Sequence, residues 1–306
     1  MMSSDVQGFR AGFVSVVGRP NAGKSTLLNA MVGRKIAITA DQPETTRRVI
    51  RGIVQLDEGQ LIVVDTPGLH RPRTLLGERL NDMVGEALSD VDAVALCMPA
   101  DEPTGPGDRF LLDLVKKTGS PILAVITKTD KVTKDRLAER IVEVSQMHDF
   151  AEIVPVSAVA GEQVELLASL LLERMPPSPP LYPRDSITDE SEETLIAELI
   201  REAALLGVRD ELPHSIAVVV DEVEERPRRE GDSRPPILAI HVSLYVERAS
   251  QKGIIIGKSG SRLKRVGRQG RESIERLLGR QVYLDLYVKV AKEWQRDPKM
   301  LGRLGF

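Results

Sequence analysis

The octet Gly18–Ser25 has the composition and spacing of a phosphate-binding loop. It reads Gly-Arg-Pro-Asn-Ala-Gly-Lys-Ser and fits the pattern G-x-x-x-x-G-K-[ST]. Glycines let backbone N–H groups approach a polyphosphate closely, Lys24 supplies charge to the outer phosphates, and the Ser25 hydroxyl can ligate Mg²⁺. The octet follows an apolar run that ends at Val17 and precedes an expected helix, which is the context that such a loop requires.

Two carboxylates end later apolar runs. Asp65 begins the turn Asp-Thr-Pro-Gly, where it can hold Mg²⁺ through water while Gly68 offers its N–H to a terminal phosphate. Asp130 ends the segment Thr-Lys-Thr-Asp, and its carboxylate can accept the N1–H and N2–H pair of guanine. Adenine would leave that charge unpaired, so this second motif favours a guanine nucleotide.

Three further segments complete the expected nucleotide site. The Lys128 stem can lie along the base, and a backbone N–H at Ser157-Ala158 can reach the guanine O6. The polar loop Asp41–Arg48 contains two threonines, and we expect Thr46 to complete the Mg²⁺ shell when a γ-phosphate is present. The alternative for this loop is an ordinary solvated connection.

The elements that must position these residues alternate between strands and helices. Nearly continuous apolar runs separated by amphipathic segments indicate a parallel sheet with helices on both faces, an α/β fold. Residues 49–60 predict an edge strand that pairs antiparallel with the following run. The expected strands are 13–18, 60–68, 92–100, 121–130 and 152–158, and the expected helices are 25–32, 75–89, 108–117, 134–148 and 164–175.

A proline-rich segment divides the chain. Residues 175–183 contain five prolines, which cannot continue a helix and favour a semi-rigid linker. We therefore predict a nucleotide-binding domain over 1–176, a linker over 177–185 and a second domain over 186–306. The second domain is expected to be a small α+β unit with a helix over 191–206, strands over 215–223, 237–246 and 282–290, and a glycine loop before a basic helix.

The glycine loop of the second domain is a candidate RNA clamp. Gly257-Lys258-Ser259-Gly260 follows the apolar residues Ile254, Ile255 and Ile256 and opens a helix. A G-x-x-G loop at a helix start clamps about four nucleotides in KH domains. Four basic side chains follow the loop in the helix: Arg262, Lys264, Arg265 and Arg268. The isoleucines can line a groove or join the core, and we expect some to do each.

Composition limits the remaining classes. The chain has 306 residues, 42% hydrophobic and 28% charged, with a net charge of −3 and no apolar run of the roughly 20 residues that span a bilayer. The single cysteine, Cys97, excludes an internal disulfide and is expected to be a buried strand residue. The charge is uneven, because residues 251–306 carry 14 Lys+Arg against 5 Asp+Glu. The near-zero total therefore conceals a basic segment suited to nucleic acid.

Taken together, the motifs resemble those of the Era family of bacterial GTPases. The resemblance rests on GRPNAGKST, PETTRR, DTPGLH, TKTD, SA and IIIGKSG and spans nearly the whole chain. It implies a P-loop GTPase domain followed by a type II KH domain. By position, phosphate binding falls to Asn21, Ala22, Gly23, Lys24, Ser25 and Thr26, with Ser25, Thr46 and Asp65 at Mg²⁺ and with Thr127, Lys128 and Asp130 at guanine. It also implies that Asn21 helps to hold K⁺; the alternative is that Asn21 only shapes the loop.

The sequence departs from the usual GTPase pattern at two positions. Thr127 replaces an asparagine whose amide braces the phosphate loop and the base, so we expect a shorter reach and weaker nucleotide binding. Leu69 stands where signalling GTPases carry a water-orienting glutamine. No catalytic base is assigned, and the transition state is expected to be stabilised by Asn21, Lys24, Thr46 and Gly68, with slow intrinsic turnover.

The function that the resemblance implies is a GTP-hydrolysing switch that binds 16S rRNA near its 3′ end and assists assembly of the small (30S) ribosomal subunit. A cytoplasmic monomer is expected, with peripheral contact to the inner membrane as an additional role. Two alternatives stay open from the residues alone. One is a metabolic kinase, which GTP and ATP turnover would distinguish. The other is a membrane-surface regulator acting through the basic C-terminal segment.

Overall fold

The computed structural model describes residues 8–39, 46–68, 74–208, 212, 215–226 and 236–306. The described residues form two compact units, one within 8–189 and the other within 190–306, with residues 74–78 grouped with the second. Each unit has its own sheet. The predicted boundaries at 176 and 185 lie close to this division and stay a prediction.

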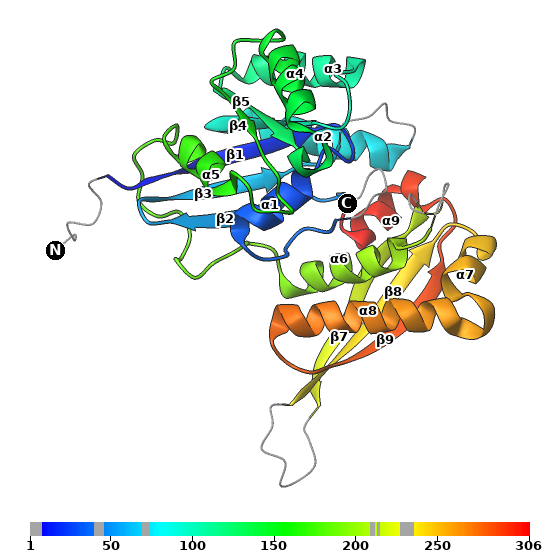
Figure 1. The fold of residues 1–306 in the computed structure, drawn as a ribbon. Coiled ribbons are helices and arrows are strands. Elements are labelled where there is room, and N and C mark those ends of the chain that lie inside the picture. Colours follow the sequence, from blue (N-terminus) through cyan, green and yellow to red (C-terminus); the bar gives the residue numbers. More distant parts are fainter. Residues whose placement is uncertain (1–7, 40–45, 69–73, 209–211, 213–214, 227–235) are drawn as a thin grey trace, which may run out of the picture. The chain divides into compact units, whose positions relative to one another are not determined.

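The first unit is built on a six-stranded sheet (Figure 1). Its strand order is β2-β3-β1-β4-β5-β6; β2 pairs antiparallel with β3, and the other neighbours are parallel. This confirms the mostly parallel sheet and the antiparallel edge strand. The strands are β1 (Arg10–Gly18), β2 (Ile50–Leu56), β3 (Gly59–Asp65), β4 (Ala93–Pro99), β5 (Ile122–Thr127) and β6 (Glu152–Pro155).

Helices cover both faces of this sheet, as expected for a parallel sheet with buried strands. On one face, α1 and α5 contact each other and β3. On the other, α2, α3 and α4 share an apolar core with β4 and β5, which includes Leu96, Leu112 and Val144. The helices are α1 (Lys24–Val32), α2 (Leu75–Ser89), α3 (Pro106–Val115), α4 (Lys134–Ser145) and α5 (Val164–Leu172), with short 3-10 turns η2 (Lys116–Thr118) and η3 (Thr129–Lys131).

The second unit packs helices against a three-stranded sheet. Strand β8 (Ile237–Val246) pairs antiparallel with β7 (Ala217–Arg226) and parallel with β9 (Val282–Val290). Helices α6 (Glu192–Leu205) and α8 (Ser261–Leu278) contact each other, and α7 (Ala249–Ile256) precedes the glycine loop η5 (Lys258–Gly260). The turn η6 (Trp294–Arg296) and α9 (Pro298–Leu304) end the unit, with Trp294 fully buried. This order confirms the α+β KH unit.

The chain that follows α5 lies against the first unit. Ser178 N–H donates to Phe9 O at 3.1 Å, and Ile53 N–H donates to Ile187 O at 2.9 Å. The segment between α5 and the second unit is thus hydrogen-bonded to β2 and to the residue before β1. Among the helices of the described residues, none is long and apolar enough to cross a membrane.

Candidate nucleotide and nucleic-acid sites

The phosphate-binding loop joins β1 to α1 and surrounds its own lysine. Its turn uses left-handed backbone at Asn21 (φ 61°) and Gly23 (φ 88°). Lys24 Nζ donates hydrogen bonds to the carbonyl oxygens of Gly18 and Arg19, both at 3.0 Å. Burial lowers the pKa of Lys24, because the loop removes its ammonium from water. A phosphate would return a compensating charge to this position.

Three oxygen-bearing side chains converge beside the loop. Ser25 Oγ donates to Asp65 Oδ2 at 2.6 Å and lies 3.0 Å from Thr46 Oγ1, which in turn donates to Asp65 Oδ2 at 3.4 Å. The other carboxylate oxygen, Oδ1, is buried and has no hydrogen-bond partner among the described residues, and burial raises the pKa of Asp65. Hydroxyl and carboxylate oxygens are the ligand types that Mg²⁺ takes, so these residues fit that ion.

The Asp-Thr-Pro-Gly turn lies against the phosphate loop. Thr66 Oγ1 donates to Val16 O in β1 at 3.0 Å. A Cβ atom on Gly68 would lie 3.0 Å from Pro20 Cγ and 3.1 Å from Pro20 N, which is tighter than ordinary packing. A glycine is therefore needed for this close approach. Leu69 and most of the Asp41–Arg48 loop lie outside the described residues, and of the two adjacent threonines only Thr46 is described.

The guanine motif is fastened at both ends. Thr127, which ends β5, donates its hydroxyl to Ala22 O in the phosphate loop at 2.6 Å, so the shorter side chain does reach the loop. Asp130 Oδ1 accepts a hydrogen bond from Ser157 Oγ at 2.7 Å, which brings two predicted segments together. Lys128 adopts left-handed backbone at φ 58°. The predicted nucleotide residues therefore meet at the carboxyl ends of parallel strands, where ligands bind in open α/β sheets.

The glycine loop of the second unit joins α7 to α8 through backbone that favours glycine. Gly257 has φ 73° and Gly260 has φ 77°. A Cβ atom on Gly257 would lie 2.7 Å from Arg262 Cβ and 3.0 Å from Arg262 N, so a side chain there distorts the loop itself. Of the preceding isoleucines, Ile255 is buried, as expected for one that joins the core, and Ile254 is 52% exposed; that an isoleucine lines a groove stays a prediction.

A groove of about 490 Å³ runs along α8 beside the edge strand β9. It contains three predicted RNA residues, Gly260, Lys264 and Arg268. It adds residues that the sequence did not single out as RNA contacts: Leu263, Gly267, Arg271, Tyr283, Leu284 and Leu286. Arg271 could have been predicted from the sequence, because it follows Arg268 by three positions and Arg268 follows Lys264 by four, so the three lie on one face of a helix.

Arg262 differs from the other basic residues of α8. Its guanidinium donates to the carbonyl oxygens of Ala204, Leu206 and Gly207 at 3.1, 2.8 and 3.4 Å, at the end of α6. A cation there satisfies carbonyls that have no partner within the helix. Burial, followed by the charge of Arg265, lowers the pKa of Arg262. The structure thus gives Arg262 a capping contact, and its predicted role toward RNA stays a prediction.

A P-loop GTPase unit followed by a KH unit is the class that this fold and these motifs define. Family models agree: residues 13–128 match "50S ribosome-binding GTPase" and residues 211–295 match "KH domain". The chain is 60% identical to GTPase Era of Mycobacterium avium and 58% identical to that of Mycolicibacterium smegmatis, over 97% of this chain and 99% of each relative.

Solved structures of Era proteins have the same fold. Aquifex aeolicus Era bound to GDP·AlF4⁻ and an Era complex with MgGDPNP and nucleotides 1506–1542 of 16S ribosomal RNA each superpose with a TM-score of 0.91. Each is 37% identical, and each match covers 97% of this chain and 99% of the other. The chain belongs to the Era family of GTPases. It therefore binds guanine nucleotide and hydrolyses GTP.

Proposed function

We propose that this GTPase is a switch whose KH unit binds 16S rRNA near its 3′ end and assists assembly and maturation of the small (30S) ribosomal subunit. The main support for this proposal is that one chain contains both kinds of site. Ser25, Thr46 and Asp65 converge beside Lys24, and the second unit contains a G-x-x-G loop and a basic groove. The relative solved with MgGDPNP and 16S rRNA nucleotides supports the same pairing of ligands.

The proposed nucleotide contacts follow the geometry of the loop and the strand ends. Phosphates bind at Asn21, Ala22, Gly23, Lys24, Ser25, Thr26 and Gly68. Guanine binds at Thr127, Lys128, Asp130, Ser157 and Ala158. Asp130 is held by Ser157 at 2.7 Å, which fixes the carboxylate that would accept two hydrogen bonds from the base. Guanine preference then arises because a base without that donor pair leaves the carboxylate unpaired.

Hydrolysis is proposed to depend on positioning and charge. Ser25 and Thr46 would hold Mg²⁺ directly and Asp65 through water. In keeping with this, a buried oxygen of Asp65 has no hydrogen-bond partner within the described part of the chain. The ion, when bound, neutralises charge on the β- and γ-phosphates. Lys24 and the Gly68 N–H serve the outer phosphates. Asn21 lies exposed in the phosphate loop, where its amide oxygen is a suitable ligand for K⁺.

Nucleotide choice tests the first half of the proposal. We expect the wild-type chain to turn over GTP and not ATP. Asp130→Ala should lose most GTP affinity, because the N1–H and N2–H donors of guanine then have no acceptor. Asp135→Ala, which removes an exposed aspartate in the first turn of α4, is the matched control and should bind GTP normally. Comparing turnover in K⁺ and Na⁺ tests Asn21. A preference for ATP would overturn the guanine assignment.

RNA binding through the groove tests the second half. We propose contacts from Gly257, Lys258, Ser259, Gly260, Arg262, Lys264, Arg265 and Arg268. Lys258→Glu is a cleaner test than a change at Gly257, because any side chain at Gly257 meets Arg262. We expect about tenfold weaker filter binding of a 16S 3′-end fragment and a salt slope smaller by about one. Lys299→Glu in α9 controls for net charge; equal losses in both variants would refute the clamp.

We further propose that the protein is a cytoplasmic monomer that contacts the cytoplasmic face of the inner membrane peripherally. The excess of Lys and Arg over residues 251–306 supports the membrane contact, since anionic lipid attracts such segments. Flotation with anionic vesicles in the absence of RNA tests it. A protein that stays at the bottom of the gradient at low salt would restrict the basic segment to RNA.

A further inference from the structure

The loop between β4 and α3, residues 100–105, brings two carboxylates to the guanine motif. Lys128 Nζ lies 3.7 Å from Asp101 Oδ1 and 3.6 Å from Glu102 Oε1. Asp101 also pairs with Lys131 Nζ at 3.7 Å. The Lys128 ammonium is thus held from the side of this loop, whereas its stem is the part proposed to lie along the base.

Glu102 also contacts the phosphate loop. Its second oxygen, Oε2, lies 3.1 Å from Arg19 Nη2, so one carboxylate joins the residue after Gly18 to the guanine motif. Arg19 is itself fixed, because its Nε donates to Asp108 Oδ1 at 2.9 Å and Asp108 is 1% exposed. The bridge therefore starts from a partly buried ion pair, in which the Arg19 side chain is 25% exposed and the Asp108 side chain 1%.

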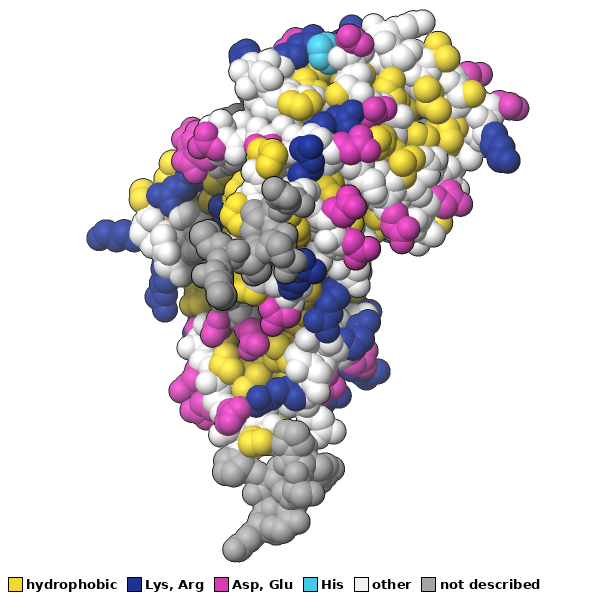
Figure 2. Space-filling model, turned by 90° about the vertical axis from the view of Figure 1, so that its left-hand side faces the viewer, with side chains coloured by type: hydrophobic (Ala, Val, Ile, Leu, Met, Phe, Trp, Pro, Cys, Tyr) yellow, Lys and Arg dark blue, Asp and Glu magenta, His cyan; other side chains and the backbone are white. Residues whose placement is uncertain are grey.

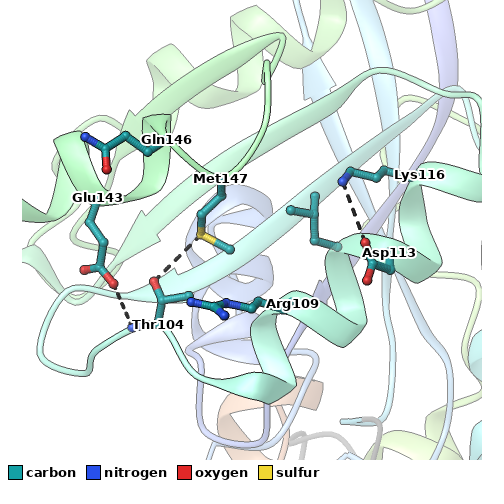
Figure 3. A pocket seen from close by; sticks show the side chains of 8 residues that line it. Thr104, Arg109, Asp113, Lys116, Glu143, Gln146 and Met147 are labelled. Atoms are coloured by element: carbon teal, nitrogen blue, oxygen red, sulfur yellow. Dashed lines mark hydrogen bonds and ion pairs between the residues drawn. The ribbon is translucent and has the colours of Figure 1, made fainter.

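The loop that carries Glu102 is held on its other side by α4. Thr104 N–H donates to Glu143 Oε1 at 3.2 Å, and Arg140 Nη1 donates to Thr104 Oγ1 at 2.5 Å. Figure 3 shows Thr104 between Glu143 and Met147 at the wall of a hollow between α3 and α4. Gly105 N–H donates to Asp108 Oδ2 at 2.8 Å. A loop fastened at these points loses little further entropy when its carboxylates pair.

We propose that Glu102 is a positioning residue that couples the phosphate and base halves of the nucleotide site. It pairs with Lys128 of the guanine motif and with Arg19 of the phosphate loop at the same time, in addition to the hydroxyl bond of Thr127. In a chain where threonine replaces the bracing asparagine, this ionic contact supplies a second link between the two motifs. The proposal rests on the nucleotide contacts proposed above.

Dissociation of fluorescent GDP and fluorescent IDP from the full-length protein tests the coupling. Glu102→Gln removes the charge and keeps the shape; we expect both nucleotides to leave about two- to fivefold faster, the scale of a partly exposed ion pair. The factor should be the same for both, because Lys128 packs on the ring, whereas Asp130 reads the N2–H that inosine lacks. The difference from wild type should vanish in 1 M KCl, where exposed charges are screened.

Asp113→Asn is the matched control, since it removes a carboxylate of α3 that pairs with Lys116 at 3.7 Å. It should leave both rates unchanged, and neither variant should shift the melting temperature of the nucleotide-free protein. Unchanged rates for Glu102→Gln, or an effect that persists in high salt, would overturn the coupling. Failure of the wild-type protein to bind GDP would instead overturn the nucleotide site itself.

Discussion

The hydroxyl of Thr127 links the guanine motif to the phosphate loop through one buried hydrogen bond, 2.6 Å from its Oγ1 to Ala22 O. Thr127→Val keeps the side-chain shape and leaves that carbonyl unpaired, which costs about 1–3 kcal/mol. We expect the first unit to melt about 3–9 °C lower and to release GDP faster. Thr118→Val is the control, because its hydroxyl bonds Val115 O in a partly buried turn. Equal melting of both variants would argue against the brace.

Asp65 gives the nucleotide-free protein a pH-dependent stability. Burial raises its pKa, so the folded chain keeps the proton to a higher pH than the unfolded chain does. Stability is therefore full below the ordinary aspartate pKa and falls as pH rises toward the folded pKa. We expect Asp65→Asn, which cannot ionise, to gain melting temperature relative to wild type as pH rises from 4 in EDTA.

With Mg²⁺ and GDP we expect the wild type to melt at a higher temperature than Asp65→Asn. The ion compensates the charge of the carboxylate in the wild type and has no charged partner in the variant. Differential scanning fluorimetry from pH 4 to 8, with and without Mg²⁺ and GDP, measures both effects. A difference between the two proteins that stays constant over this range, in EDTA, would mean that Asp65 titrates normally in the folded state.

Strand β3 holds the segment after α5 through a single buried side chain. Gln60 Oε1 accepts hydrogen bonds from the N–H groups of Leu181 and Tyr182 at 2.9 and 3.0 Å, and Nε2 donates to Tyr182 O at 2.7 Å. Gln60→Leu removes all three, so we expect the amides of residues 181 and 182 to exchange hydrogen at least about tenfold faster. Gln146→Leu, on the exposed end of α4, should leave that exchange unchanged.

Periodicity identified most elements, and contacts between distant segments account for what it did not identify. The predicted ranges Leu75–Ser89 and Ile237–Val246 coincide with α2 and β8. Helix α3 begins at Pro106, two residues before the predicted start, because Asp108 accepts a hydrogen bond from Gly105 N–H and so caps the helix. The part played by Gln60 depends on residues more than 100 positions away, and no local pattern carries that information.

The contact made by Arg262 was hidden for the same reason. In the sequence it is one of four basic residues after a glycine loop, whereas in the fold its guanidinium meets the end of α6. The motifs predicted for phosphate and guanine follow the ends of β1, β3, β5 and β6, and parallel strands end at one edge of a sheet. The sequence could therefore predict that these motifs lie together, whereas it could not predict the side chains that contact them.

Across the whole chain, the basic side chains are concentrated in the last segment rather than in one whole unit. The total is −3, yet residues 251–306 carry 14 basic and 5 acidic side chains. On the face drawn in Figure 2, Lys and Arg of the second unit gather mostly toward one edge and Asp and Glu toward the other. A basic edge next to an acidic one favours RNA strands that approach in one orientation, because phosphates are repelled from the acidic side.

The single tryptophan of the chain allows the stability of the two units to be measured separately. Trp294 is fully buried in the second unit, where its Nε1–H donates to Ser215 O at 3.1 Å. We expect its fluorescence to follow urea unfolding of that unit, while release of fluorescent GDP follows the first. A ligand at 100 times its Kd stabilises the unit it binds by about 2.7 kcal/mol.

GDP with Mg²⁺ should therefore leave the tryptophan transition in place, and a 16S 3′-end fragment should move it to higher urea. For the first unit we expect the converse: the RNA fragment should leave the rate at which fluorescent GDP is released unchanged. Trp294→Phe carrying the same ligands controls for fluorescence that does not come from the indole. If GDP moves the tryptophan transition as far as RNA does, the two cores unfold as one cooperative unit, and nucleotide state is linked to the RNA-binding fold through stability itself.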